Sequence, residues 1–244
     1  MIVSRLSESL QDRNWTTLVL ELFIVVLGVF LGLQAQAWYE ERERRDLEGD
    51  YIVRLHDDVM GLQERRAQLI EFREGWNAGL QSVKPVLFDG VDRAITPNEC
   101  RGMAFSYIVS NPTDDLGSLI ELQSSGRLSL VRNERVSRAI QSFLLTRARA
   151  RDSQAGVSRT QPALTTDFPD VFRVLAPTDP MADPAVPGIV ECDAEGMRMD
   201  RAFLNAFEIA QANYGFHMRD NTAVSASLAE LHEALEETLG IEHE

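Results

Sequence analysis

The chain has 244 residues, of which 44% are hydrophobic, so it can form one large domain or two small ones. Its formal net charge of -14 repels phosphate backbones and anionic lipid headgroups, which argues against nucleic acid as a partner. Its two cysteines form no CxxC motif, and no cluster of histidine and cysteine has zinc-ligand spacing.

An apolar segment near the N-terminus is the most distinctive feature of the sequence. Every residue from Leu18 to Leu33 is apolar or glycine except Glu21, and Trp15 and Trp38 bracket the run as interfacial aromatic residues do. At about 1.5 Å per residue, the helix between the tryptophans is roughly 35 Å long, more than a hydrocarbon core of about 30 Å. We therefore expect an N-terminal tail over residues 1–14 and a transmembrane helix over residues 15–39.

One side of this helix carries mostly small residues. At 100° per residue, a narrow stripe contains Glu21, Val25, Gly28, Gly32, Ala35 and Tyr39. Small residues let a second helix come close, and an acid in an apolar segment favours protein over lipid. The stripe predicts contact with another membrane helix, from a second copy or from a different protein. The alternative is that both glycines are ordinary membrane glycines and that Glu21 reaches the headgroups.

The end of the apolar run permits a rival interpretation. Ala35-Gln36-Ala37 has the A-x-A pattern of a signal-peptidase site, and cleavage would release a soluble protein beginning at Trp38. The length of the preceding region, its acid and its weak basic charge argue against cleavage.

The orientation of the helix in the membrane is a separate question, and arginine counts alone would keep the C-terminal side in the cytoplasm. The short tail, the signal-like segment and a possible disulfide favour a periplasmic C-terminal domain instead.

Residues 40–244 are predicted to form one helical soluble domain. Apolar residues recur at 3–4 spacing from Ile52 to Leu80, interrupted by Arg66 and Arg73, so one helix could run unbroken from the membrane to about Leu80. A capping box over Thr96–Glu99, with proline at the first helical position, starts another helix.

Further elements follow to the C-terminus. Asn111–Asp114 is expected to cap a short helix that Ser124–Gly126 ends, and a long helix is expected over about 133–154. Prolines then define a loop at about 162–190, in which 168–175 could form one or two helical turns and 188–191 a short extended piece.

The last helix is expected from about Asp200 to Leu239, and no convincing hairpin occurs. The predicted fold is all-α, most simply an antiparallel bundle of about four main helices. Cys100 and Cys192 could form one disulfide or remain two buried thiols, and the sequence leaves both open.

Candidate chemistry is sparse. His56 precedes Asp57 and Asp58, a set that could bind a metal, but adjacent residues point in different directions on a helix, so a solvated face is favoured. His217 is expected inside the bundle, and His232 and His243 on its surface.

The turn from Ser124 to Arg127 could bind an anion, although a helix stop is the favoured interpretation. No phosphate-binding glycine loop, nucleophile elbow or zinc-protease motif occurs. We therefore predict no catalytic, cofactor-binding or metal-binding residue, and no enzyme.

Two stretches resemble a known family. The anchor pattern E-x6-G-x5-Q-x3-W-x-E, from Glu21 to Glu40, and the segment Glu121–Leu128 are similar to a bacterial family that has no assigned activity. Its members have one N-terminal membrane helix and a helical C-terminal domain. The chain departs from the family at Tyr39, and its C-terminal half has no counterpart. The resemblance implies location in a bacterial inner membrane and a helical architecture, but no activity or cofactor.

The sequence thus predicts a non-enzymatic single-pass membrane protein. It would act as an accessory subunit or scaffold of a membrane complex, with the lipid bilayer and other membrane helices, or a second copy, as partners. The alternative is a membrane-anchored sensor or ligand-binding helical bundle.

Overall fold

A computed structural model describes residues 15–175 and 190–241 of the chain. The described part is mostly helical and divides into two compact units between Tyr51 and Ile52, a boundary that falls within the first helix. In chain order the elements are α2 (Trp15–Ser82), α3 (Lys84–Phe88), α4 (Pro97–Phe105), α5 (Gly117–Ser124), η1 (Leu128–Leu130), α6 (Glu134–Thr160), α7 (Leu164–Asp167), β1 (Phe172–Val174), β2 (Val190–Cys192), α8 (Ala194–Met199) and α9 (Arg201–Leu239).

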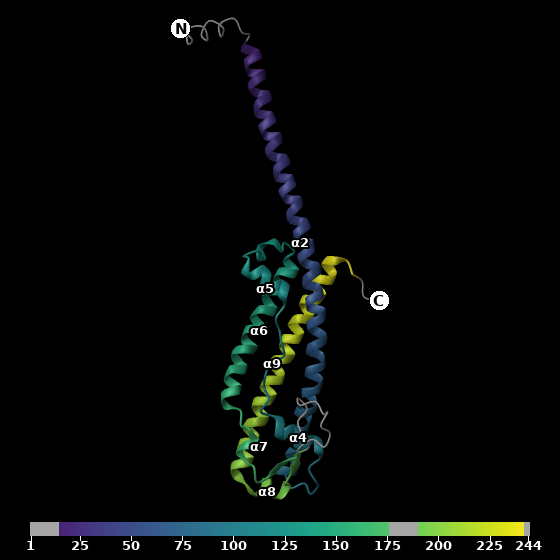
Figure 1. The fold of residues 1–244 in the computed structure, drawn as a ribbon, viewed down its shortest axis with the longest axis vertical. Helices are drawn as coiled ribbons and strands as arrows, with labels where there is room; N and C mark the ends of the chain where they lie inside the picture. The colour runs from purple at the N-terminus through teal and green to yellow at the C-terminus, as the bar shows by residue number, and fades with distance from the viewer. Residues whose placement is uncertain (1–14, 176–189, 242–244) are drawn as a thin grey trace. The chain divides into compact units, whose positions relative to one another are not determined.

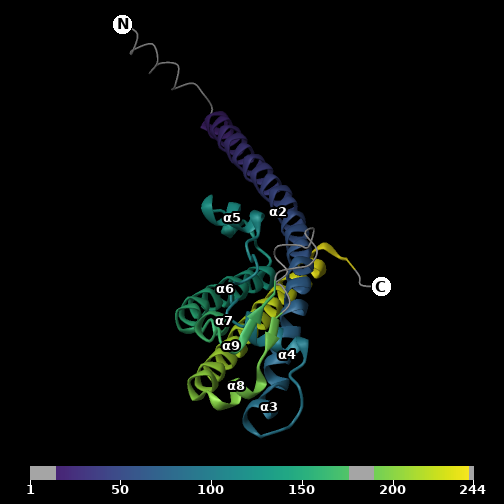
Figure 2. The ribbon, with the colours of Figure 1, turned by 60° about the horizontal axis from the view of Figure 1, so that its bottom comes forward.

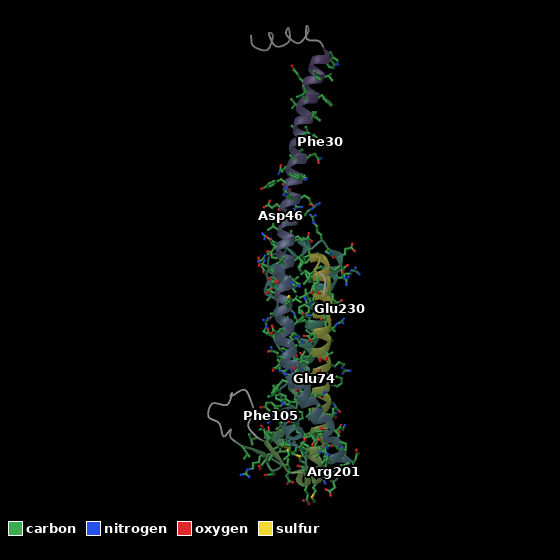
Figure 3. All side chains as sticks on the ribbon, turned by 90° about the vertical axis from the view of Figure 1, so that its right-hand side faces the viewer. Phe30, Asp46, Glu74, Phe105, Arg201 and Glu230 are labelled. Atoms are coloured by element: carbon green, nitrogen blue, oxygen red, sulfur yellow. A yellow bond between two sulfur atoms is a disulfide. The ribbon has the colours of Figure 1, made fainter. Side chains whose placement is uncertain are left out.

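The first unit contains the N-terminal part of α2. Its apolar side chains are exposed, including Phe30, which Figure 3 labels. By length and composition this part of α2 could cross a membrane, and none of its most apolar stretch is buried. A core helix of a soluble domain would bury such residues, whereas a signal sequence would share the pattern. The expectation that one unbroken helix reaches about Leu80 is confirmed, since α2 ends at Ser82.

In the second unit, α6 and α9 are long helices that pack together (Figure 1). Side chains of the preceding residues cap them: Asn133 accepts from two backbone N–H groups of α6, and Asp200 does the same for α9. Helix α9 ends at Leu239, and Gly240 caps it with a φ of +67° that suits glycine. The predicted bounds of α9 are confirmed, whereas α6 continues past the expected end near residue 154 to Thr160.

The short helices α3, α4, α7 and α8 and the strand pair gather around the N-terminal end of α9, whereas α5 lies apart from them (Figure 2). The predicted capping box of α4 is present: Thr96 accepts from the Glu99 N–H, and the Glu99 carboxylate accepts from the Thr96 N–H at 2.8 Å. The predicted cap of α5 is wrong, because Leu116 is its N-cap residue and Asp114 instead binds Arg151.

A pair of short strands corrects the sequence analysis. Strand β1 pairs antiparallel with β2, with Phe172 opposite Cys192. The helical turns proposed for residues 168–175 are wrong for 172–174, since an extended backbone lets Phe172 pair with β2 and bury its ring. The extended piece proposed near residue 190 is confirmed. The rest of the proline-rich loop, residues 176–189, lies outside the described residues.

The main apolar core lies where the short elements meet α2 and α9. Buried side chains from α2 (Trp76, Leu80), α4 (Met103) and α9 (Phe203, Phe207) belong to this core. Two glycines bring α2 and α4 together. A Cβ at Gly79 would lie 2.6 Å from the Asn98 carbonyl oxygen, and one at Gly102 would lie 2.6 Å from the Trp76 carbonyl oxygen. Only glycine therefore permits this helix contact.

Candidate functional site

The predicted membrane stripe lies on the exposed part of α2. Glu21, Val25, Gly28, Gly32 and Ala35 are all exposed. A Cβ at Gly28 or Gly32 would meet no described atom within 4 Å. Their surroundings therefore differ from those of the glycines between α2 and α4, where backbone already fills the space. Among the described residues, none occupies the space in front of these two glycines.

Cys100 and Cys192 are joined in a disulfide, with an S–S distance of 2.05 Å and Cα atoms 5.8 Å apart. The bond ties the buried start of α4 to the end of β2, next to the core. Disulfides persist in oxidising compartments and are rare in the cytosol. A disulfide in the second unit is therefore more typical of a protein domain in an oxidising compartment than of one in the cytosol.

A buried arginine joins α2 to α9. Arg73 is 4% exposed, donates to the carbonyl and hydroxyl oxygens of Ser110, and lies 3.0 Å from Nε2 of His217. Burial, together with the neighbouring Arg73 charge, lowers the pKa of His217 to about 4. His217 is therefore neutral at pH 7, and we assign its Nε2 as the acceptor for Arg73. The predicted burial of His217 is confirmed.

A second buried arginine lies two turns earlier on α2. Arg66 is 2% exposed and donates to the Asn221 carbonyl oxygen at 3.0 Å and to the Ser225 hydroxyl at 3.3 Å. Burial lowers its pKa, while the charge of Asp114 acts in the opposite direction. Within the described ranges, neither buried arginine is seen in an ion pair with a carboxylate. Both thus occupy core positions, where the sequence showed only interruptions of an apolar stripe.

A third polar cluster lies further toward the N-terminal end of the second unit. His56 is 8% exposed, so its expected place on a solvated face is wrong. It shares its surroundings with His232 and Glu236 of α9, and the ligand atoms of all three lie within 4.8 Å of one another. Nε2 of His232 is 3.3 Å from the Glu236 carboxylate, and the two imidazole centroids are 5.1 Å apart.

Of the two acids that follow His56, Asp58 points toward α5, whereas the largely exposed Asp57 keeps one carboxylate oxygen 3.8 Å from Nδ1 of His56. The Asp57 side chain is 75% exposed, and Asp58 accepts from the backbone N–H and hydroxyl of Ser118 at 2.7 Å each. Asp58 thereby satisfies an N-terminal N–H group of α5. The expected surface position of His232 is only partly met, since its side chain is 21% exposed. His243 lies outside the described residues.

The cluster borders the solvent. A shallow depression of about 440 Å³ lies beside it and is lined by Asp57, Met60, Gly61, Gln63, Glu64 and His232. The sequence contained one usable signal that we missed. His232 and Glu236 are four residues apart on one helix, a spacing that places two ligand-type side chains on the same face.

Comparison of the chain with protein-family models, with curated proteins and with solved structures finds no match.

Proposed function

We propose that the protein is a non-enzymatic single-pass membrane protein that serves as accessory subunit or scaffold of a membrane complex. The observation that carries this proposal is the exposed apolar part of α2, with the small-residue stripe along one side. Gly28 and Gly32 would let a second helix approach closely, so that van der Waals contacts could hold the pair together.

The domain beyond the membrane is proposed to be an antiparallel bundle of about four main helices, in the periplasm of a bacterium. Two contacts support the antiparallel direction: Arg66 meets Asn221, whereas the later Arg73 meets the earlier His217. The disulfide supports an oxidising compartment. The net charge of -14 supports a protein partner over nucleic acid.

The test substitutes both glycines of the stripe. In full-length protein in mild detergent, Gly28→Leu with Gly32→Leu should disperse the complex that the wild-type protein forms, because two added side chains would separate the helices. Sedimentation velocity measures the change, and the proteins that co-purify identify the partner.

A control variant carries Val26→Leu and Phe30→Leu, on the opposite side of the helix at 100° per residue. It should sediment like the wild type. An unchanged profile for the glycine variant, or equal dispersal by the control, would rule out docking through this stripe.

A further inference from the structure

We propose that His56, His232 and Glu236 bind a divalent transition-metal ion, for which zinc is the best-suited probe. Two imidazole nitrogens and one carboxylate oxygen are a ligand set that zinc accepts, with a fourth position left for water. The three residues come from two helices, His56 from α2 and the other two from adjacent turns of α9. Helix packing, and not sequence proximity, therefore assembles the set.

The distances are within reach of coordination. Zinc binds nitrogen and oxygen at about 2.0–2.2 Å, so tetrahedral ligand atoms lie roughly 3.4 Å apart. Nε2 of His232 and the Glu236 carboxylate are already 3.3 Å apart, and all three ligand atoms lie within 4.8 Å of one another. Side-chain rotations can close the remaining gap, while the helices stay in place.

An independent observation points to a missing ligand. Nε2 of His56 is buried and has no hydrogen-bond partner in the part of the chain that the structure describes. Buried polar atoms are nearly always satisfied, and one that is not costs stability. A metal ion at this point would accept the nitrogen lone pair. The other ring nitrogen, Nδ1, lies 3.8 Å from the Asp57 carboxylate, which is beyond hydrogen-bond distance. A rotation of the exposed Asp57 side chain would let this carboxylate accept from Nδ1 and orient the ring.

The surroundings suit an ion that remains accessible. The depression beside His232 provides a path from solvent and room for a water ligand. Two further carboxylates, Asp57 and Glu64, line it and would attract a cation. The bound ion would connect α2 to α9 inside the second unit. This inference goes beyond docking of the membrane helix, and it stands even if that docking is disproved.

The experiment uses full-length protein in mild detergent, purified through a tag that contains no histidine and stripped with a chelator. Zinc is titrated by calorimetry, and bound metal is counted by mass spectrometry. We expect one tightly bound zinc per chain and a rise in melting temperature on zinc addition. His232→Gln or Glu236→Gln should weaken binding at least about 100-fold, beyond the loss of an outer-sphere partner.

Glu233→Gln is the matched control, because Glu233 lies on the same helix but is exposed. It should bind zinc as the wild type does. His56→Gln tests the ligand from α2, and its helical circular dichroism is recorded before zinc is added. If that variant fails to fold, the partly exposed His232 decides the question through His232→Gln. The proposal is overturned if the wild type binds no zinc stoichiometrically, if the histidine variants bind as the wild type does, or if Glu233→Gln weakens binding as much as Glu236→Gln.

Discussion

Removal of the disulfide is expected to cost the second unit much of its stability. The bond joins residues 92 positions apart. In the chain-entropy model, a loop of this length restricts the unfolded chain by an entropy worth about 4.6 kcal/mol at 25 °C. The whole stability of a domain is about 5–15 kcal/mol. We therefore expect Cys100→Ala with Cys192→Ala to lower the free energy of unfolding by about 3–5 kcal/mol.

Urea unfolding of the full-length protein in mild detergent measures this loss. Trp76 is a suitable probe because it is 6% exposed and its ring packs against Phe72 at 4.8 Å and Phe105 at 5.7 Å, between centroids. Its fluorescence should change when the core around α4 opens. A Trp76→Phe variant identifies its share of the signal against that of Trp15 and Trp38, which are exposed on the first unit.

Reductant provides the control for this experiment. The wild-type protein with reductant should unfold at nearly the same urea concentration as the double variant, and reductant should leave the double variant unchanged. A difference below about 1 kcal/mol between oxidised and reduced protein would refute the reasoning, since loop closure predicts several times more. Free thiols detected in the untreated protein would show that the disulfide itself does not form.

Two further predictions concern single residues of the second unit. The pKa of His217 is about 4 in the folded chain against an ordinary value of 6.5, so the unfolded chain binds the proton first and stability falls as pH drops from 6.5 to 4. His217→Gln should flatten this part of the curve of unfolding free energy against pH, and an unaltered slope would contradict the buried neutral imidazole. Gly102→Ala should cost about 1–3 kcal/mol in urea unfolding, because its Cβ would lie 2.6 Å from the Trp76 carbonyl oxygen. Gly156→Ala, at an exposed helical position with nothing within 4 Å, should be neutral or stabilising; equal losses in both would contradict the close packing.

The long helices could be predicted because their signals are local. Apolar residues at 3–4 spacing mark α2 and α9, and the Thr96–Glu99 capping box marks the start of α4. The strand pair could not be predicted in this way. Phe172 and Cys192 are partners, but they lie too far apart in sequence for a short hairpin turn, so neither segment indicates the other as its partner.

The polar clusters could not be predicted from sequence without knowing which helix faces meet. His56 was judged with Asp57 and Asp58, its neighbours in sequence, whereas its actual partners lie on α9. Arg66 and Arg73 looked like breaks in an apolar stripe. They occupy the buried positions of that stripe because their guanidinium groups find acceptors on Asn221 and Ser110. A buried hydrogen-bonded cation and a surface cation can have the same sequence spacing, and only the opposing element distinguishes them.

The polar residues between α2 and α9 fall into two groups, those whose hydrogen-bonding atoms find partners within the described part of the chain and those whose atoms do not. Arg66 and Arg73 donate to carbonyl, hydroxyl and imidazole acceptors, so their network is explained by contacts that the chain itself supplies. Well-packed apolar residues could replace such a network with little loss of stability. His56 differs because its buried Nε2 finds no acceptor or donor among the described residues, although two ligand-type side chains lie beside it. Contacts within the described chain therefore explain the two arginines but leave Nε2 of His56 unsatisfied, and the proposed cation would satisfy it.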